Sequence, residues 1–122
     1  MHDEYIVGYS VNIEEKNIII HIYNNNEKKK KSFCFSDVLT HSFKCIIDYN
    51  IVMDFKVYDI SCFIKENQKE LKEMKGYCWP IDYQTEQELI NFLVDKEYKY
   101  IKINSSYGMC GWILAKYYKI CE

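Results

Sequence analysis

Residues 33–60 constrain the fold most, because they hold the densest run of apolar residues in the chain. From residue 51 to residue 60, apolar side chains alternate with partly polar ones. A period of two is typical of a β-strand that turns one face to the core and the other to water. We therefore expect residues 33–60 to form two or three central strands that lead into the first helix.

The same alternation marks both ends of the chain. Residues 5–13 and 17–23 predict a β-hairpin with a polar turn between them, and residues 98–104 and 111–120 predict two closing strands. Between the closing strands, Gly108 and Gly111 indicate a hairpin turn that needs positive φ angles. The run of four lysines that ends at Lys31 favours a solvated loop or a charge-guarded edge strand over a nucleic-acid or membrane patch.

Two helices are expected between these strand regions. Residues 61–75 show apolar side chains at helical spacing, with Asp59 or Ser61 able to cap the start and Gly76 suited to the end. Residues 85–88 (Thr-Glu-Gln-Glu) form a capping box that opens a second helix through about residue 97.

The order of strands, helices and strands predicts the fold class. We expect a single α+β domain over residues 1–122, with a mostly antiparallel β-sheet of about six or seven strands. The two helices between residues 61 and 97 pack on this sheet. A chain of 122 residues buries about two thirds of its unfolded surface, so it folds without a disulfide or a metal.

The charge distribution argues against nucleic-acid binding. All 16 basic residues are lysine, and they are balanced by 18 acidic residues, for a net charge of −2. Arginine, the side chain best suited to bidentate recognition of phosphate and guanine, is absent. No apolar run is long enough to span a membrane, and the N-terminus does not have the pattern of a signal peptide. We expect a cytoplasmic protein without membrane or nucleic-acid contacts.

The candidate metal and redox motifs are weak. Six cysteines occur without a CxxC pair, and a cytoplasmic location keeps thiols reduced. Cys34, His41 and Cys45 contain the right donor atoms for zinc, but their spacing differs from the close pairs typical of structural sites. His2 and Asp3 form the dyad of some metal-dependent phosphohydrolases without the further motif that such enzymes need. We therefore expect no metal and no cofactor.

An alternative interpretation keeps a small enzyme or ligand-binding domain open. Its pocket would lie around His41, Cys45 and Asp37, because a histidine beside a thiol or a carboxylate can act in catalysis. A concave pocket lined by these three residues, with a shifted histidine pKa, would favour it.

Short motifs in three parts of the chain carry a family resemblance. They are His2-Asp3 before the first strand, the central motifs at residues 35–38, 41–43 and 50–54, and the closing pair at residues 105–108 and 111–112. With them the chain resembles small uncharacterised bacterial proteins, some of which are similar to immunity proteins of polymorphic or contact-dependent toxin systems. The resemblance implies no catalytic residues and a function in binding a cognate toxin.

The hypothesis that follows is a non-catalytic protein-binding module, in the form of an immunity protein that neutralises a toxin. Exposed tyrosine, tryptophan and acidic side chains are the usual anchors of such an interface. The candidate partner-binding residues are Tyr49, Asp54, Tyr58, Trp79 and Tyr83. The sequence leaves open whether the protein is a monomer or a homodimer.

Overall fold

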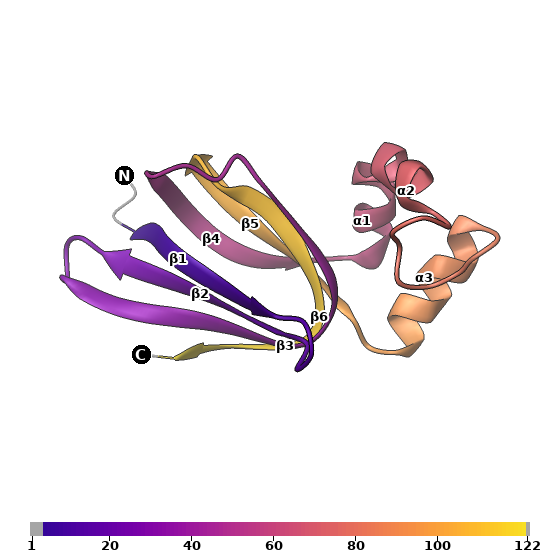
Figure 1. Ribbon diagram of the computed structural model, residues 1–122, viewed down its shortest axis with the longest axis horizontal. Coiled ribbons are helices and arrows are strands. Elements are labelled where there is room, and N and C mark those ends of the chain that lie inside the picture. The colour runs from indigo at the N-terminus through magenta and orange to yellow at the C-terminus, as the bar shows by residue number, and fades with distance from the viewer. Residues whose placement is uncertain (1–3, 122) are drawn as a thin grey trace.

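The structure, a computed structural model, describes residues 4–121 and is dominated by a closed barrel of six antiparallel strands (Figure 1). The strands are β1 (Glu4–Asn12), β2 (Asn17–Asn24), β3 (Lys29–Lys44), β4 (Asn50–Tyr58), β5 (Lys99–Tyr107) and β6 (Cys110–Cys121). Around the barrel they run in the order β1-β2-β3-β6-β5-β4. The prediction of a mostly antiparallel sheet with helices is confirmed, whereas the closure into a barrel is a feature that the prediction lacked.

Two strands, β3 and β4, cover the region of residues 33–60 in which two or three central strands are expected, because β3 is one long strand. It pairs with β2 through residues 29–36 and with β6 through residues 32–44, so one strand serves both neighbours. The change of direction falls at Asp37, which has a φ of 52°, and at a bulge between Val38 and Thr40. A residue with positive φ beside a bulge bends a strand without ending its pairing.

Three short helices, α1 (Ile60–Glu66), α2 (Gln68–Met74) and α3 (Glu86–Asp95), lie between β4 and β5. The first two replace the single helix predicted over residues 61–75, because the chain breaks at Asn67. The predicted capping box at Thr85 and the positive φ of Gly76 are confirmed. Asp59 occupies the N-cap position of α1, but its side chain makes no capping hydrogen bond.

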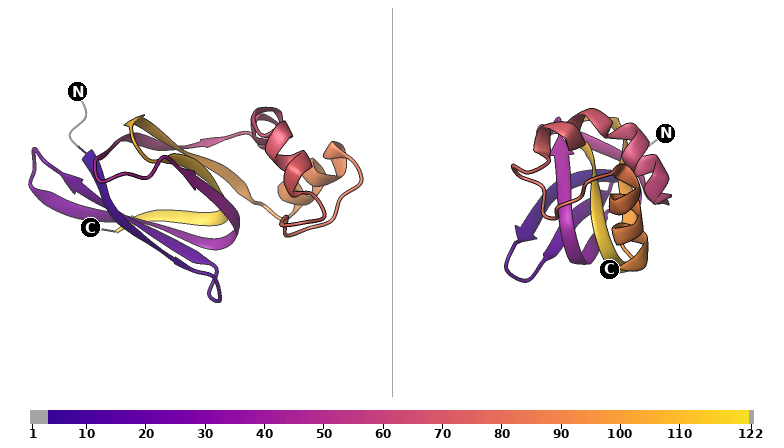
Figure 2. Two further views of the ribbon diagram at one scale, coloured as in Figure 1. Left: turned by 45° about the horizontal axis from the view of Figure 1, so that its top comes forward. Right: turned by 90° about the vertical axis from the view of Figure 1, so that its right-hand side faces the viewer.

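Successive side chains of β5 and β6 point to opposite faces and so contribute to two hydrophobic cores. Ile101 and Ile113 point into the barrel, whose interior also contains Ile18, Ile20 and Ile22. Their neighbours point outward, where Tyr100, Trp112 and Leu114 pack against the helices. The helices therefore sit at one end of an elongated molecule and cover the outer face of β5 and β6 (Figures 1 and 2). Within the described chain, no helix has the length and apolar content needed to cross a membrane.

The barrel closes weakly between β1 and β4. Only Glu4, Tyr5 and Ile6 of β1 pair with β4, although β1 pairs with β2 along its whole length. Beyond Ile6, the second edge of β1 has no strand partner in the described chain. The end of β3 and the loop that follows it lie alongside this edge, as the ring contact between Tyr9 and Phe43 shows. This arrangement creates the grooves described next.

Candidate functional site

A groove of about 590 Å³ lies between β1 and the loop that joins β3 to β4. Residues 5–9 of β1 form one wall, residues 46–50 form the other, and Tyr23 and Met109 complete the lining. We call this the tyrosine groove. Several of its apolar side chains are exposed, including Val7, Ile46 and Ile47.

Three tyrosines cluster at one side of the tyrosine groove. The ring of Tyr49 lies 5.2 Å from that of Tyr5 and 6.2 Å from that of Tyr107. Tyr49 also donates a hydrogen bond from its hydroxyl to that of Tyr5, at 3.4 Å. Tyr49 is 51% exposed and Tyr107 is 57% exposed. The cluster therefore offers aromatic surface and hydroxyl groups to a second molecule.

The buried side chain of Asn50 holds the loop that carries Tyr49. Its Oδ1 accepts hydrogen bonds from the backbone N–H of Met109 at 2.8 Å and from that of Ile47 at 3.2 Å. Its Nδ2 donates to the carbonyl of Ile47 at 2.7 Å. One amide thus joins the loop to the turn between β5 and β6. The loop wall of the tyrosine groove is consequently fixed before any partner arrives.

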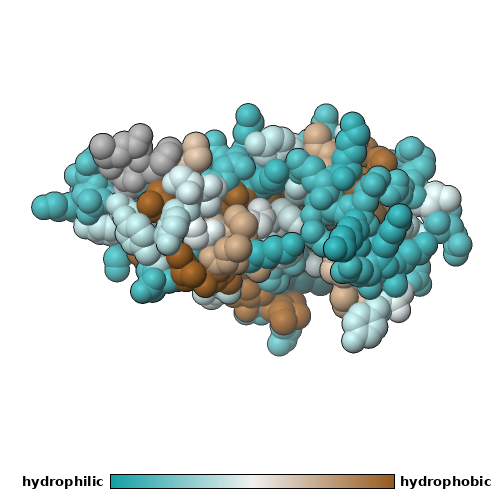
Figure 3. Space-filling view, turned by 90° about the horizontal axis from the view of Figure 1, so that it is seen from above, coloured by the Kyte–Doolittle hydropathy of each residue, from teal (hydrophilic) through white to brown (hydrophobic). Residues whose placement is uncertain are grey.

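The surface has an uneven distribution of apolar groups. In the view from above, hydrophobic side chains gather on the barrel half, while the helical half is largely hydrophilic (Figure 3). Exposed apolar patches on a folded protein mark sites of interaction with other molecules. The barrel, and not the helical end, is the half on which we place the candidate site.

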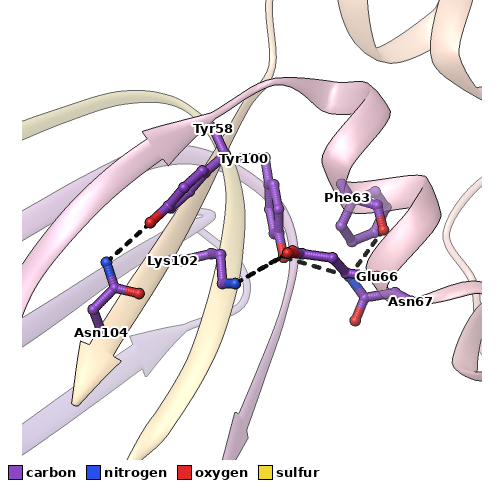
Figure 4. A network of polar contacts seen from close by, with 7 residues as sticks. All are labelled: Tyr58, Phe63, Glu66, Asn67, Tyr100, Lys102 and Asn104. Carbon is purple, nitrogen blue, oxygen red and sulfur yellow. Dashed lines mark hydrogen bonds and ion pairs between the residues drawn. The ribbon is translucent and has the colours of Figure 1, made fainter. Parts of the chain in front are cut away.

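A second groove, of about 760 Å³, lies between α1 and the outer faces of β4 and β5. Figure 4 shows the network along it. Tyr100 donates to Glu66 at 2.7 Å, and the ammonium of Lys102 lies 3.3 Å from the same carboxylate oxygen. Lys44 pairs with Glu70 at 3.3 Å in the same groove. These charges are neutralised by one another, so the contacts brace α1 and α2 against the barrel.

The ionisation of this network follows from its hydrogen bonds. The phenol of Tyr100 and the ammonium of Lys102 lower the pKa of Glu66. Burial and the hydrogen bond to Glu66 raise the pKa of Tyr100 well above its ordinary value. Tyr100 therefore stays a proton donor and Glu66 stays a carboxylate near neutral pH. This pattern suits a structural contact better than proton transfer.

The pocket expected around His41, Cys45 and Asp37 is divided in the structure. His41 lines a groove of about 280 Å³ with residues 11–13, and this groove contains neither of the other two side chains. We call it the His41 groove. Burial lowers the pKa of His41, so its ring is neutral near pH 7. Asp37 sits at the bend of β3, and Cys45 is an exposed residue beyond the end of that strand.

The five candidate partner-binding residues lie in three places. Tyr49 lines the tyrosine groove, whereas Asp54 and Tyr58 share Asn104, which donates to Asp54 at 2.6 Å and to Tyr58 at 3.3 Å.

The other two candidates belong to the helical end. Trp79 is 9% exposed and stacks on Phe63 at 6.0 Å, so its side chain is part of the helical core. Tyr83 is half-buried beneath the ammonium of Lys75, which lies 4.8 Å from its ring. Of the five residues, Tyr49 alone lies in the tyrosine groove.

Two of the cysteines are neighbours on the barrel. The Sγ atoms of Cys34 and Cys121 lie 3.3 Å apart, and both residues are free thiols. Burial and the neighbouring Cys121 raise the pKa of Cys34. Among residues 4–121, no three His, Cys, Asp or Glu side chains are grouped in a way that could hold a metal ion. The dyad His2-Asp3 lies outside the described residues.

Several groove residues were missed by sequence reasoning. Tyr5, Val7 and Tyr9 belong to a predicted strand, and Ile46 and Ile47 lie within the region of expected central strands but follow the end of β3 at Lys44. The signal was present in β1, because residues 5–13 contain no charged side chain. A strand without charged residues is expected to have both faces covered by other elements. In β1, however, several side chains are exposed.

No protein-family model, curated protein or solved structure matches this chain. Its function is therefore inferred from the fold and from the surfaces described above.

Proposed function

We propose that this protein is a non-catalytic protein-binding module, in the form of a bacterial immunity protein that binds and neutralises a toxin domain. The tyrosine groove is its docking surface. The observation that carries the proposal is the cluster of Tyr5 with the exposed Tyr49 and Tyr107, beside the exposed side chains of Val7 and Ile47.

The composition of the cluster supports a protein as the partner. Tyrosine is enriched at protein interfaces, since its ring buries a large apolar area while its hydroxyl finds a hydrogen-bond partner. Among the described residues that line the groove, Asp48 is the one ionisable group other than tyrosine. A small charged substrate would find few partners there, whereas apolar side chains of a protein would fill it.

The rigid setting of the loop supports the same proposal. Asn50 fixes the backbone of Ile47 and Met109 through three hydrogen bonds. A loop that is ordered in advance loses little conformational entropy on binding, which favours tight association. An inhibitor of a toxin needs such affinity, because any free toxin remains harmful.

Co-expression tests this function directly. The protein is produced in cells together with a candidate toxin domain encoded beside its gene, and growth and co-purification are measured. We expect growth to be restored and the two proteins to purify as one complex. A chain that neither restores growth nor co-purifies with that domain would overturn the proposed function.

A further inference from the structure

We propose that the free edge of β1 accepts an extended segment of the partner as an added β-strand. The inferred segment is apolar at its centre and basic at both ends. This inference rests on the proposed function, since it assumes that the partner is a protein, and it adds how that partner is recognised.

Part of β1 has a backbone edge without a strand partner among the described residues. Residues 8–12 of β1 pair with β2 on one side, Val7 lies at a bulge in that pairing, and β4 pairs only with residues 4–6 on the other side. Within residues 4–121, no backbone hydrogen bond from a loop reaches residues 7–12 either. In antiparallel pairing, alternate residues direct their N–H and C=O groups to each side. A row of donors and acceptors is therefore available to another strand.

This edge of β1 lacks charged side chains that would guard it. Proteins guard a free edge with charged side chains, proline or cover from another element, because an unguarded edge pairs with other chains. Residues 54–58 of β4, which pair with β5 but not with β1, contain Asp54 and Lys56. Residues 7–13 contain no charge, although Val7 is 57% exposed. An edge that is apolar and has no backbone partner is suited to recognition by strand addition.

Two grooves lie along this edge of β1. The tyrosine groove and the His41 groove both contain residues of β1, and the contact between Tyr9 and Phe43 at 5.2 Å separates them. Successive side chains of a strand point to opposite faces, so those of one face can enter the two grooves in turn. Apolar side chains at alternate positions fit this lining of Val7, Val11 and Ile13.

Acidic residues lie near both ends of the free edge of β1. Asp48 lies in the tyrosine groove, and the hairpin beyond β1 has Glu14 and Glu15 against one Lys16. Within the described residues, neither Asp48 nor Glu14 is part of an ion pair. Both ends of an uncharged centre are thus acidic. Basic groups on either side of an apolar strand complement this pattern.

The same charges argue against a second copy of this chain as the occupant. Two β1 edges related by a twofold axis would pair antiparallel. The hairpin with Glu14 and Glu15 would then lie near Asp48 of the other copy, and like charges in close proximity are unfavourable. The added strand therefore comes from a different protein.

A peptide selection tests the inference without knowledge of the partner. Random peptides of about twelve residues, twice the length of a six-residue strand segment, are displayed and selected on the immobilised protein. The variant Val7→Lys serves for counter-selection, because a lysine on the edge opposes strand addition. Ile120→Lys is the matched control, since Ile120 is 55% exposed on a part of β6 that pairs only with β3.

The expected peptides have alternating apolar residues with lysine or arginine at both ends. Their retention should fall at least about tenfold on Val7→Lys and stay unchanged on Ile120→Lys. Peptides with helical spacing, peptides with acidic ends, or a failure to enrich any peptide over Val7→Lys would overturn the inference. A wild-type dimer that Val7→Lys dissociates would also overturn it.

Amide hydrogen exchange with a selected peptide separates strand addition from simple docking. Strand addition protects alternate amides within residues 8–12, because the new strand bonds only those that face away from β2. Protection confined to residues 46–49 would overturn the strand-addition inference while leaving the proposed docking surface intact. The co-expression experiment tests that surface's function separately, so the two failures are distinguishable.

Discussion

Asn50 shows how a single buried side chain can shape the docking surface. Its amide makes three hydrogen bonds, and the residue is 5% exposed. We expect Asn50→Ala to lower the free energy of unfolding by about 2–4 kcal/mol, because buried partners lose their hydrogen bonds. Urea denaturation measures this change. The exposed turn residue Asn25 provides the control, and equal stability of Asn50→Ala and Asn25→Ala would contradict the assigned role.

The contact between Tyr100 and Glu66 has a predictable pH dependence. It lowers the pKa of Glu66 below its ordinary value of 4.5. A carboxyl group with a lower pKa in the folded state adds stability above its unfolded pKa, and this contribution is lost as the pH falls through the folded pKa. We expect Tyr100→Phe to reduce the acid-induced loss of stability.

Urea midpoints between about pH 6 and pH 3 measure this effect. Tyr58→Phe is the matched control, because the Tyr58 hydroxyl accepts a hydrogen bond from Asn104 and does not touch Glu66. The control should keep the wild-type dependence on pH. Parallel pH curves for the wild type and Tyr100→Phe would show that the phenol does not set the pKa of Glu66.

At the scale of elements, the capping box of α3 is a local feature with a definite energetic effect. Thr85 accepts a hydrogen bond from the N–H of Glu88 at 3.2 Å. We expect Thr85→Ala to destabilise the protein by about 1 kcal/mol, since a cap is lost. Asp59→Ala should cost less, because Asp59 caps α1 without a side-chain hydrogen bond. Thermal unfolding compares the two variants, and a larger loss for Asp59→Ala would refute this ranking.

The elements that sequence predicts well are those set by local rules. Alternation predicts the first hairpin, and the capping box predicts the start of α3. Glycine at position 108 predicts the turn, where its φ is 82°. Gly111 has a φ of 152°, and a Cβ there would overlap the backbone of Ser42. In each case the cause lies within a few residues of the effect.

The break between α1 and α2 could not be predicted in this way. The apolar spacing from Ile60 to Met74 continues through it, so periodicity favours one helix. Asn67 ends α1 because its Nδ2 donates to the carbonyl of Phe63 at 2.9 Å and to Tyr100 at 3.5 Å. Tyr100 lies on β5, and so the break depends on a tertiary contact.

At the scale of the whole molecule, alternation predicts strands but not the closure of their sheet. An open sheet and a barrel place the same residues inside, and the closing pairs join Glu4 to Val52 and Ile6 to Asn50. The tyrosine groove follows from that closure, because its walls come from residues 5–9 and 46–50. Of the candidate site, only Tyr49 was therefore predictable, from its residue type and its position in a turn.

The most direct test of the docking surface is the affinity of the purified toxin domain for two tyrosine variants. Tyr49 lies in the tyrosine groove, whereas Tyr117 lies on β6, and the two are 51% and 60% exposed. Isothermal titration should show that Tyr49→Ala raises the Kd by about 10- to 100-fold, as expected for an interface anchor. Tyr117→Ala should leave the Kd unchanged. Equal Kd values for wild type and Tyr49→Ala would contradict the account.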